Sequence, residues 1–311
     1  MKYSSRDVIE FGAFAALGVI VRLLPLRVAQ RFGRRLGEFI YTTIKIRREI
    51  TYQNLRAAFP EKTMEELDGI ALEAYCNFAI NFIEMFWLPR MNHSVLLHVV
   101  KVRNGEVFQE IRNRGKGYIM ISGHFGNWEL FAFSICTLFN SPSLIIAQNQ
   151  RNPLVNALLN KYRSLCGNRI VAMERSVQET LRALHQGQGV LMLADQSAPR
   201  ERIYIDFFGR PAATFEGPAV FALRSGAPIV MAFLIRQKNN TYELVFEELS
   251  TTDLHEATEE NIHELTKRHV KVLERYIREY PGQWLWLHKR WKHTEYALSH
   301  ASEETVNPES K

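Results

Sequence analysis

The chain has 311 residues, and 46% of them are hydrophobic, so it is long enough to bury a large core, as one big domain or as a domain with a helical appendage. Lys and Arg number 39 against 33 Asp and Glu, which gives a formal net charge of +6 and suits an anionic partner. Three cysteines without paired spacing (Cys76, Cys136 and Cys166) argue against a disulfide framework and favour a protein that faces the cytoplasm.

The N-terminal 48 residues carry the strongest charge bias. Between positions 22 and 48 eight residues are basic and only Glu38 is acidic, and apolar side chains recur there at helical spacing. The preceding apolar run, 11–21, is shorter than the ~20 residues that span a bilayer. We therefore predict that residues 1–48 form an amphipathic anchor that lies in or dips into a membrane, with arginines on anionic lipids. The alternative is an amphipathic helix packed on the protein's own core.

The pattern changes near residue 95. Up to that point the periodicity predicts helices, and beyond it continuous apolar strands alternate with helices. Residues 49–293 are therefore expected to form an α/β domain, with a mostly parallel central sheet flanked by helices and a helical lead-in to about residue 95. Residues 294–311 are polar and aperiodic and predict a loose tail. The expected strands are 118–121, 144–147, 170–173, 190–194, 203–207, 229–235 and 242–246, and the expected helices are 128–138, 153–166, 177–185, 217–225 and 259–280.

The segment 118–129 is the most informative part of the chain. The apolar run 118–121 ends at Ser122-Gly123, His124 follows at once, and Glu129 stands five positions later. On one continuous helix two such residues lie ~140° apart around the axis and do not meet. With His124 in a strand-to-helix turn and Glu129 in the first helical turn, the carboxylate would reach back to the imidazole and prepare it as a general base. The alternative is a capped helix with one surface histidine.

Asp195 is a second polar residue that directly follows an expected strand, 190–194. Ligands of open α/β sheets bind beyond the carboxyl ends of the strands. His124 and Asp195 would therefore face the same crevice if their strands are neighbours. The alternative for Asp195 is a buried residue that caps a turn or a helix.

Three further segments offer candidates. Arg163 lies at the far end of its expected helix, either in a site or as a solvated cation at a helix C-terminus. Thr214 and Glu216 are placed to cap helix 217–225, whose N-terminus suits an anionic oxygen, although an ordinary capped loop has the same pattern. The stretch 284–292 mixes aromatic and basic residues, as a core edge, a membrane-interface belt or a nucleic-acid stripe does. His288 within it is interpreted as a structural histidine.

Several catalytic motifs are missing from the sequence. It has no G-x-S-x-G elbow, no G-x-x-x-x-G-K-[ST] phosphate loop, no H-E-x-x-H motif and no clustered cysteine pair. No nucleophile stands beside His124, so direct deprotonation of a bound substrate by this histidine is the simplest chemistry. We expect neither a metal ion nor a soluble cofactor.

Together these residues resemble one family, the late acyltransferases of lipid A biosynthesis, within the wider lysophospholipid and glycerolipid acyltransferase group. The hallmark of that group is H-x-x-x-x-D/E, here His124 to Glu129. The resemblance runs nearly end to end. Its other motifs are Asn54-Leu55, Ala58-Phe59-Pro60, Asn152-Pro153-Leu154 leading to Arg163, Asp195, Phe208-Gly209-Arg210-Pro211 with Thr214 and Gly217, Gly226-Ala227-Pro228, and Trp286-Leu287-His288-Lys289-Arg290.

The resemblance implies an O-acyltransferase at the cytoplasmic face of the bacterial inner membrane. It would take a fatty acyl chain from acyl–acyl carrier protein and transfer it to a hydroxyl of a lipid A precursor. Its partners would be the carrier protein, the glycolipid acceptor and anionic membrane lipids, and not nucleic acid. The Gly126-Asn127-Trp128 core also resembles that of the mycobacterial phosphatidylinositol mannoside acyltransferases, so a phospholipid or inositol-lipid acceptor stays the alternative.

The same resemblance assigns roles to residues. Catalysis would rest on His124 as the base and on Glu129, which would orient it. Arg163 or backbone N–H groups would stabilise the oxyanion, and Asp195 would position Arg163 or the acceptor. The residues expected to bind substrate are Arg163, Asp195, Asn127, Arg210, Thr214 and Gly217.

Overall fold

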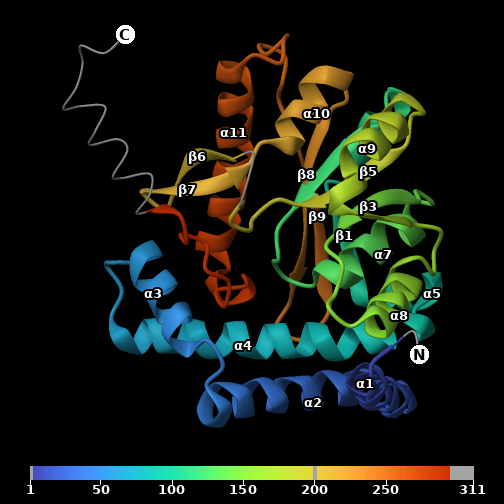
Figure 1. Ribbon diagram of the computed structural model, residues 1–311, viewed down its shortest axis with the longest axis vertical. Coiled ribbons are helices and arrows are strands. Elements are labelled where there is room, and N and C mark those ends of the chain that lie inside the picture. The colour runs from blue at the N-terminus through green and yellow to red at the C-terminus, as the bar shows by residue number, and fades with distance from the viewer. Residues whose placement is uncertain (1–2, 199–201, 295–311) are drawn as a thin grey trace.

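A seven-stranded, mostly parallel sheet forms the centre of the protein in the computed structural model, which describes residues 3–198 and 202–294 (Figure 1). The strand order is β1-β9-β8-β2-β5-β3-β4. The strands from β8 to β4 are parallel to one another, whereas β9 pairs antiparallel with β8, and β1 runs parallel to β9. The strands are β1 (Val100–Arg103), β2 (Tyr118–Ser122), β3 (Ser143–Ala147), β4 (Arg169–Ala172), β5 (Gly189–Leu193), β8 (Ile229–Arg236) and β9 (Tyr242–Leu249).

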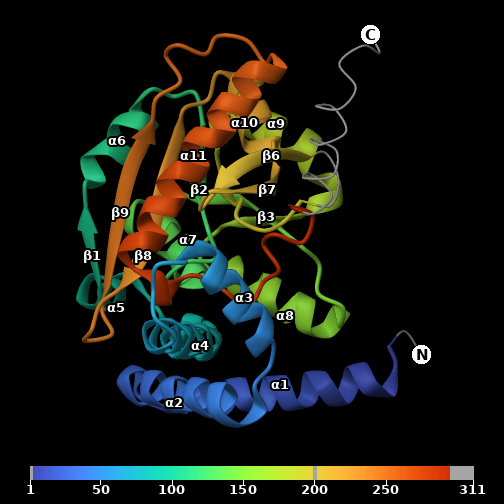
Figure 2. The same ribbon diagram turned by 90° about the vertical axis from the view of Figure 1, so that its left-hand side faces the viewer.

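The two faces of the sheet are covered by different helices (Figure 2). Successive strand residues point to opposite faces, so Ile119 and Ile121 of β2 enter one core while Tyr118 and Met120 enter the other. Because both faces are covered, every residue of β2 is buried. The first core includes α9 (Ser176–His185), α10 (Gly217–Ser225) and α11 (Glu259–Glu279), and the second includes α5 (His93–Val99), α6 (Gly105–Asn113), α7 (Trp128–Leu138) and α8 (Pro153–Arg163).

Helix α4 (Met64–Trp87) runs along one end of the sheet, and α1 (Ser5–Leu23) and α2 (Leu26–Phe39) form a layer outside it (Figures 1 and 2). Helices α2 and α4 pack closely because the contact positions on α2 are glycines. A Cβ atom on Gly33 or Gly37 would stand only 2.8 or 2.5 Å from a Cα atom of α4. The short π-helix η1 (Ile40–Ile44) and α3 (Arg48–Ala58) connect this layer to α4.

The exposed surface of the α1–α2 layer mixes apolar and basic side chains. They are Val19, Ile20, Leu23, Arg27, Val28, Arg31, Phe32, Arg34, Arg35 and Phe39. Helices thus form where the N-terminal pattern predicts them. In the described part of the chain, no helix combines the length and the apolar character needed to cross a bilayer.

Most of the expected elements appear with ends shifted by a few residues, but the hairpin of β6 (Arg202–Phe207) and β7 (Arg210–Phe215) differs from expectation. It stands apart from the central sheet, and β7 occupies residues for which no strand was expected. The reason is local, because Phe208 and Gly209 both adopt positive φ angles, 56° and 74°, and make a two-residue hairpin turn. Strand β1 and helix α6 were also not among the expected elements.

The C-terminal segment packs against this hairpin. Thr294, where the tail was expected to begin, is buried, and its hydroxyl donates to the carbonyl oxygen of Pro211 at 2.7 Å. The rest of the expected tail, 295–311, lies outside the described residues. Short helices η2 (Leu88–Arg90), η3 (Met173–Arg175) and η4 (Pro281–Gln283) complete the elements of the described ranges.

Candidate active site

His124 and Asp195 follow neighbouring strands. Strands β2 and β5 pair in parallel, with Ser122 opposite Leu193, so both residues stand just beyond the carboxyl ends of adjacent strands. The strands that carry His124 and Asp195 are therefore neighbours, as the expectation of a shared site required. Open α/β sheets bind their ligands at this edge.

The two side chains are directly bonded. The Asp195 carboxylate accepts the backbone N–H of His124 at 2.7 Å and the ring Nδ1–H at 2.8 Å. Trp284 donates its indole Nε1–H to the same carboxylate at 2.8 Å. The Asp195 side chain is only 2% exposed, whereas that of His124 is 21% exposed, so the imidazole remains open to a substrate.

The surroundings keep Asp195 ionised and determine which ring nitrogen of neutral His124 carries the proton. Burial raises the pKa of Asp195, but the charge and hydrogen bonds of His124 and the bond from Trp284 outweigh it and hold that pKa below its usual range. With Nδ1–H donating to an ionised carboxylate, the lone pair of neutral His124 lies on Nε2, the atom a general base needs. A carboxylate that accepts Nδ1–H also stabilises the imidazolium formed when Nε2 takes a proton.

Glu129 pairs with Arg163 rather than with His124. The guanidinium donates its Nε–H to Glu129 at 2.9 Å and its Nη2–H to the other carboxylate oxygen, and the two side chains are only 12% and 17% exposed. Within the described ranges no hydrogen bond joins Glu129 to His124. The predicted contact of Glu129 with His124 is thus wrong. Asp195 bonds His124 and Trp284 rather than Arg163, and the other role expected of it, positioning the acceptor, stays a prediction. The reason is that Asp195 holds both the backbone and the ring of His124, while Glu129, in the first turn of α7, faces the end of α8.

The turn that carries His124 requires a glycine. Gly126 has a φ of +55°, and a Cβ atom there would stand 1.9 Å from the carbonyl oxygen of Leu234 in β8. The turn is held on its other side by the segment after η4. Gly126 donates its N–H to the carbonyl oxygen of Gln283 at 2.9 Å, and the carbonyl oxygen of His124 accepts the N–H of Leu285 at 3.0 Å.

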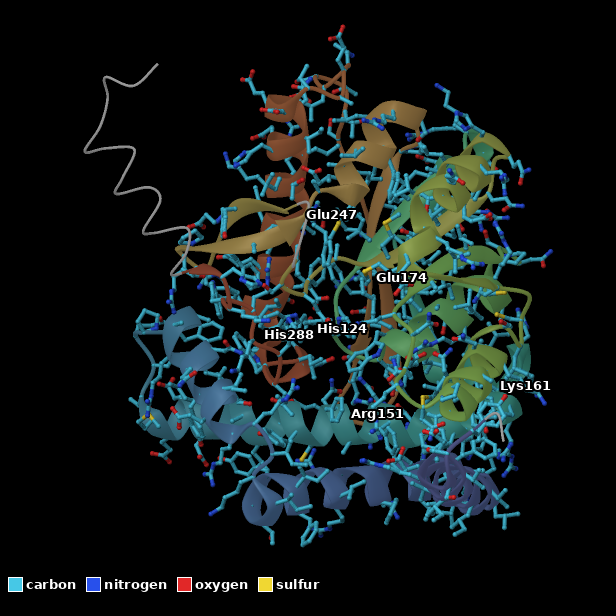
Figure 3. The ribbon with its side chains drawn as sticks, in the orientation of Figure 1. His124, Arg151, Lys161, Glu174, Glu247 and His288 are labelled. Atoms are coloured by element: carbon cyan, nitrogen blue, oxygen red, sulfur yellow. The ribbon has the colours of Figure 1, made fainter. Side chains whose placement is uncertain are left out.

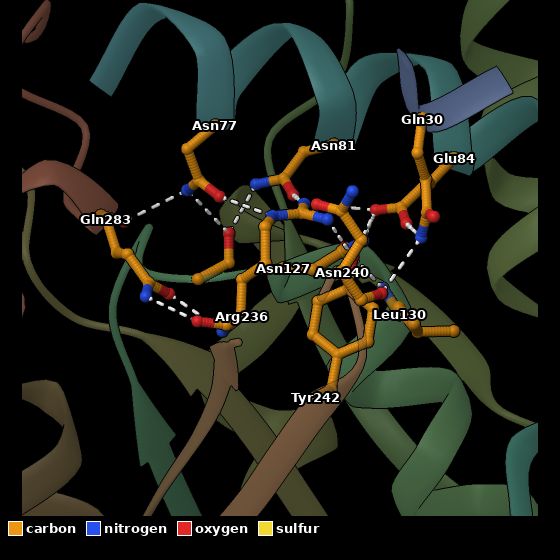
Figure 4. A network of polar contacts seen from close by, with 11 residues as sticks. Gln30, Asn77, Asn81, Glu84, Asn127, Leu130, Arg236, Asn240, Tyr242 and Gln283 are labelled. Atoms are coloured by element: carbon orange, nitrogen blue, oxygen red, sulfur yellow. Dashed lines mark hydrogen bonds and ion pairs between the residues drawn. The ribbon is translucent and has the colours of Figure 1, made fainter. Parts of the chain in front are cut away.

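A buried polar network fixes the same turn against α4 (Figure 4). Asn77 and Asn81 on α4 both donate side-chain N–H groups to the carbonyl oxygen of Gly126, Asn77 at 3.1 Å. Arg236, at the end of β8, donates to the side-chain oxygens of these asparagines at 2.8 and 2.6 Å. It also pairs with Glu84 at 3.0 Å, and the two charged side chains are 8% and 1% exposed. Removing one partner of such a pair would leave an uncompensated buried charge.

Asn127 also belongs to this network. Its side-chain oxygen accepts the N–H of Leu130 at 2.9 Å and so caps α7, while its side-chain N–H donates to Glu84 at 2.6 Å. The side chain is 1% exposed. Both ends of its amide are therefore used inside the protein, and the substrate contact expected of Asn127 stays a prediction.

Of the residues expected around α10, Arg210 and Thr214 lie in the β6–β7 hairpin. Thr214 lies in β7 rather than at a helix cap, and it is buried with its hydroxyl donating to the carbonyl oxygen of Ala212 at 2.9 Å and accepting from Arg290 at 2.7 Å. Its hydroxyl is thus engaged inside the protein, and the substrate contact expected of Thr214 stays a prediction. Arg210 is exposed on β7, with its guanidinium over the Trp291 ring, and Gly217 is the first residue of α10.

His288 supports the site from the C-terminal segment, and Figure 3 shows it and His124 above α4. Its Nε2 accepts the backbone N–H of Ser197 at 3.1 Å, two residues after Asp195. Burial lowers the pKa of His288 to about 4, so its ring is neutral at pH 7. Asn54 donates its side-chain N–H groups to the carbonyl oxygens of Trp286 and His288, both at 2.7 Å. The family motifs around Asn54 and around His288, distant in sequence, are thus in contact.

Sequence reasoning missed two close neighbours of the histidine. Trp284 bonds Asp195, and the Gln196 amide nitrogen stands 3.3 Å from Nε2 of His124. The position of Gln196 directly after Asp195 was the available signal. Trp284 had none beyond its aromatic segment. Within residues 3–198 and 202–294, no three His, Cys, Asp or Glu side chains are grouped so as to hold a metal ion.

The profile of the bacterial lipid A biosynthesis acyltransferases matches residues 3–293. The chain belongs to this family. It is therefore an acyltransferase of the lipid A biosynthesis family, and the resemblance inferred from its motifs is confirmed.

Individual relatives are distant but cover most of the chain. The lipid A biosynthesis lauroyltransferase of Escherichia coli K12 is 25% identical over 281 residues, 88% of each chain. The lipid A biosynthesis myristoyltransferase of the same strain is 23% identical over 272 residues, 86% of this chain and 82% of the relative. The phosphatidylinositol mannoside acyltransferase of Mycolicibacterium smegmatis is 22% identical over 289 residues, 89% of this chain and 90% of the relative.

Proposed function

We propose that the protein transfers a fatty acyl chain from acyl–acyl carrier protein to a hydroxyl of a lipid A precursor. The observation that carries this proposal is the His124–Asp195 pair beyond β2 and β5, in a chain of the lipid A acyltransferase family. The lauroyl- and myristoyltransferase relatives support the choice of acceptor pathway. The net charge of +6 suits both an acidic carrier protein and a phosphorylated lipid.

In the proposed mechanism Nε2 of His124 removes the proton of the acceptor hydroxyl. The buried Asp195 carboxylate holds the ring and offsets the positive charge that develops on it. The alkoxide attacks the thioester carbonyl carbon and forms a tetrahedral oxyanion. The carbon–sulfur bond then breaks, and the leaving thiolate takes the proton from His124, so the enzyme returns to its starting state.

Arg163 is the proposed cationic donor in the same site. Glu129 takes its Nε–H and Nη2–H and thereby fixes the plane of the guanidinium. Because Glu129 holds two nitrogens of the planar guanidinium, the third nitrogen, Nη1, has a fixed direction. We assign this nitrogen to an oxyanion or a substrate phosphate, so that Glu129 acts through Arg163 and not through His124.

We further propose that the α1–α2 layer binds the cytoplasmic face of the bacterial inner membrane. Its exposed apolar side chains would enter the interface while Arg27, Arg31, Arg34 and Arg35 contact lipid phosphates. A helix pair that lies on the surface needs no bilayer-spanning length. This arrangement leaves α4 between the bound layer and the turn that carries His124.

A phosphatidylinositol mannoside or phospholipid acceptor is the second candidate, favoured by the mycobacterial relative. The test is a panel in which purified protein receives acyl–acyl carrier protein or acyl–coenzyme A as donor, and a lipid A precursor, lysophosphatidic acid or a phosphatidylinositol mannoside as acceptor. We expect mass spectrometry to find acyl transfer to the lipid A precursor at the highest kcat/KM. Preferred acylation of either other lipid would replace the proposed acceptor, and preferred use of acyl–coenzyme A would replace the proposed donor.

A further inference from the structure

The side-chain amide of Gln196 contacts Nε2 of His124, the atom that takes the proton in the proposed mechanism. Its amide Nε2 stands 3.3 Å from Nε2 of His124. Nδ1–H of the histidine is already donated to Asp195, so Nε2 carries the lone pair and the amide N–H of Gln196 is its donor. Without substrate, the base is therefore hydrogen-bonded to a side chain of the protein.

The position of Gln196 is well determined by its neighbours. Asp195 on one side is buried and bonded to His124 and Trp284, and Ser197 on the other donates its backbone N–H to His288 at 3.1 Å. Gln196 itself is partly exposed and stands at the open edge of the sheet. Its side chain can therefore leave His124 while its backbone stays in place.

Any molecule that gives its proton to His124 must first replace this amide. A bound acceptor presents its hydroxyl at a high effective concentration, because binding contacts elsewhere on the lipid hold it in place. A water molecule has no such contacts. If water did reach Nε2, its hydroxide would attack the thioester, the carbon–sulfur bond would break, and the thiolate would recover the proton from His124. The products would be a free fatty acid and an unloaded thiol.

We propose that Gln196 selects the acceptor hydroxyl over water by occupying Nε2 of His124 until the acceptor is bound. The inference rests on the proposed function, since it needs His124 to be the base and a thioester to be the donor. In this role Gln196 protects His124 from water, which a purely structural side chain would not do. Removing the amide would open the base to water without removing the base.

The experiment measures two rates with purified protein: hydrolysis of acyl–acyl carrier protein without acceptor, and acyl transfer with acceptor. In Gln196→Ala, and in Gln196→Met, which keeps the length of the side chain, we expect hydrolysis to rise roughly 2- to 10-fold, the range set by one hydrogen bond. The KM for the acceptor should be unchanged or lower, and kcat for transfer should be kept. Gln186→Ala, an exposed glutamine before β5, is the matched control and should leave both rates unchanged.

The possible outcomes separate this inference from the proposed function. Hydrolysis by the Gln196 variants at or below the wild-type rate overturns the inference, and so does a parallel fall of both rates, which would make Gln196 an ordinary catalytic donor. His124→Ala is measured beside them. If it hydrolyses and transfers at wild-type rates, the proposed role of His124 fails, and the inference fails with it for a different and visible reason.

Discussion

The Asp195 carboxylate holds His124 at two points, accepting its backbone N–H at 2.7 Å and its ring Nδ1–H at 2.8 Å. One side chain thereby fixes both the strand-end turn and the tautomer of the ring. Because Asp195 and His124 follow paired strands, the sheet itself sets the distance between them. Glu129, the carboxylate of the sequence motif, is left to hold Arg163.

The Glu129–Arg163 pair should be needed for turnover. Replacing Arg163 by Ala removes a proposed oxyanion donor, and losses of this kind lower kcat ~10²–10³-fold. Arg163→Lys should be nearly as damaging, because an ammonium group cannot donate to Glu129 through two nitrogens in a fixed plane. Lys161→Ala, an exposed position two residues earlier on α8, is the control. Full activity in Arg163→Ala with an unchanged melting temperature would remove this pair from the site.

Gly126→Ala should destabilise the protein far more than another glycine substitution at positive φ. The new Cβ atom at position 126 would stand 1.9 Å from the Leu234 carbonyl oxygen, which is backbone and cannot turn away. We expect a loss of about 3 kcal/mol or more in unfolding free energy, or no folded protein. Gly115→Ala, with φ +68° but nothing within 4 Å of the new atom, should cost only about 1 kcal/mol. Equal losses in urea unfolding would contradict the close approach at Gly126.

The α1–α2 layer should bind anionic membranes in a salt-dependent way. Reversing the charge at Arg31, Arg34 and Arg35 should weaken vesicle binding, since each basic residue near an anionic surface contributes about 1 kcal/mol. The same number of reversals at exposed Arg175, Arg224 and Lys238, outside this layer, is the control. Sedimentation with phosphatidylglycerol vesicles at low and high salt measures the effect. If both triple variants bind as wild type does, the layer is not the membrane surface.

Acid should destabilise the protein partly through His269 on α11. Burial, helped by the charge of Arg290, lowers the pKa of His269 to about 3 from the usual 6.5. Between these values the unfolded chain binds a proton that the folded chain does not, so stability falls as the pH drops below 6.5. His269→Leu should therefore reduce the stability difference between pH 7 and pH 5 by about 2 kcal/mol. Urea unfolding at both pH values tests this, with exposed His263→Leu as the control; the same pH dependence in both variants would contradict it.

The order of strands and helices in the α/β region could largely be predicted, because buried parallel strands are continuous apolar runs that alternate with amphipathic helices. The hydrogen-bond partners of the site residues could not be predicted from the sequence. The spacing of His124 and Glu129 is compatible with a hydrogen bond between them. In the structure, however, Asp195 from the neighbouring strand takes the ring N–H of His124. Only the strand order, which places β5 beside β2, decides between these carboxylates. Asn127 and Thr214 show the same limit, because sequence alone does not reveal that a polar side chain is already bonded inside the protein.

We propose that His124 and Asp195 act as one unit. The transfer rates of His124→Ala, Asp195→Ala and the double variant, measured with acyl–acyl carrier protein and a lipid A precursor, test this directly. Loss of a general base lowers the rate ~10²–10⁴-fold, and groups that act together are not additive. We expect a loss in this range for each single variant and no further loss in the double variant. Near-wild-type transfer by either single variant, or losses that multiply in the double variant, would contradict it.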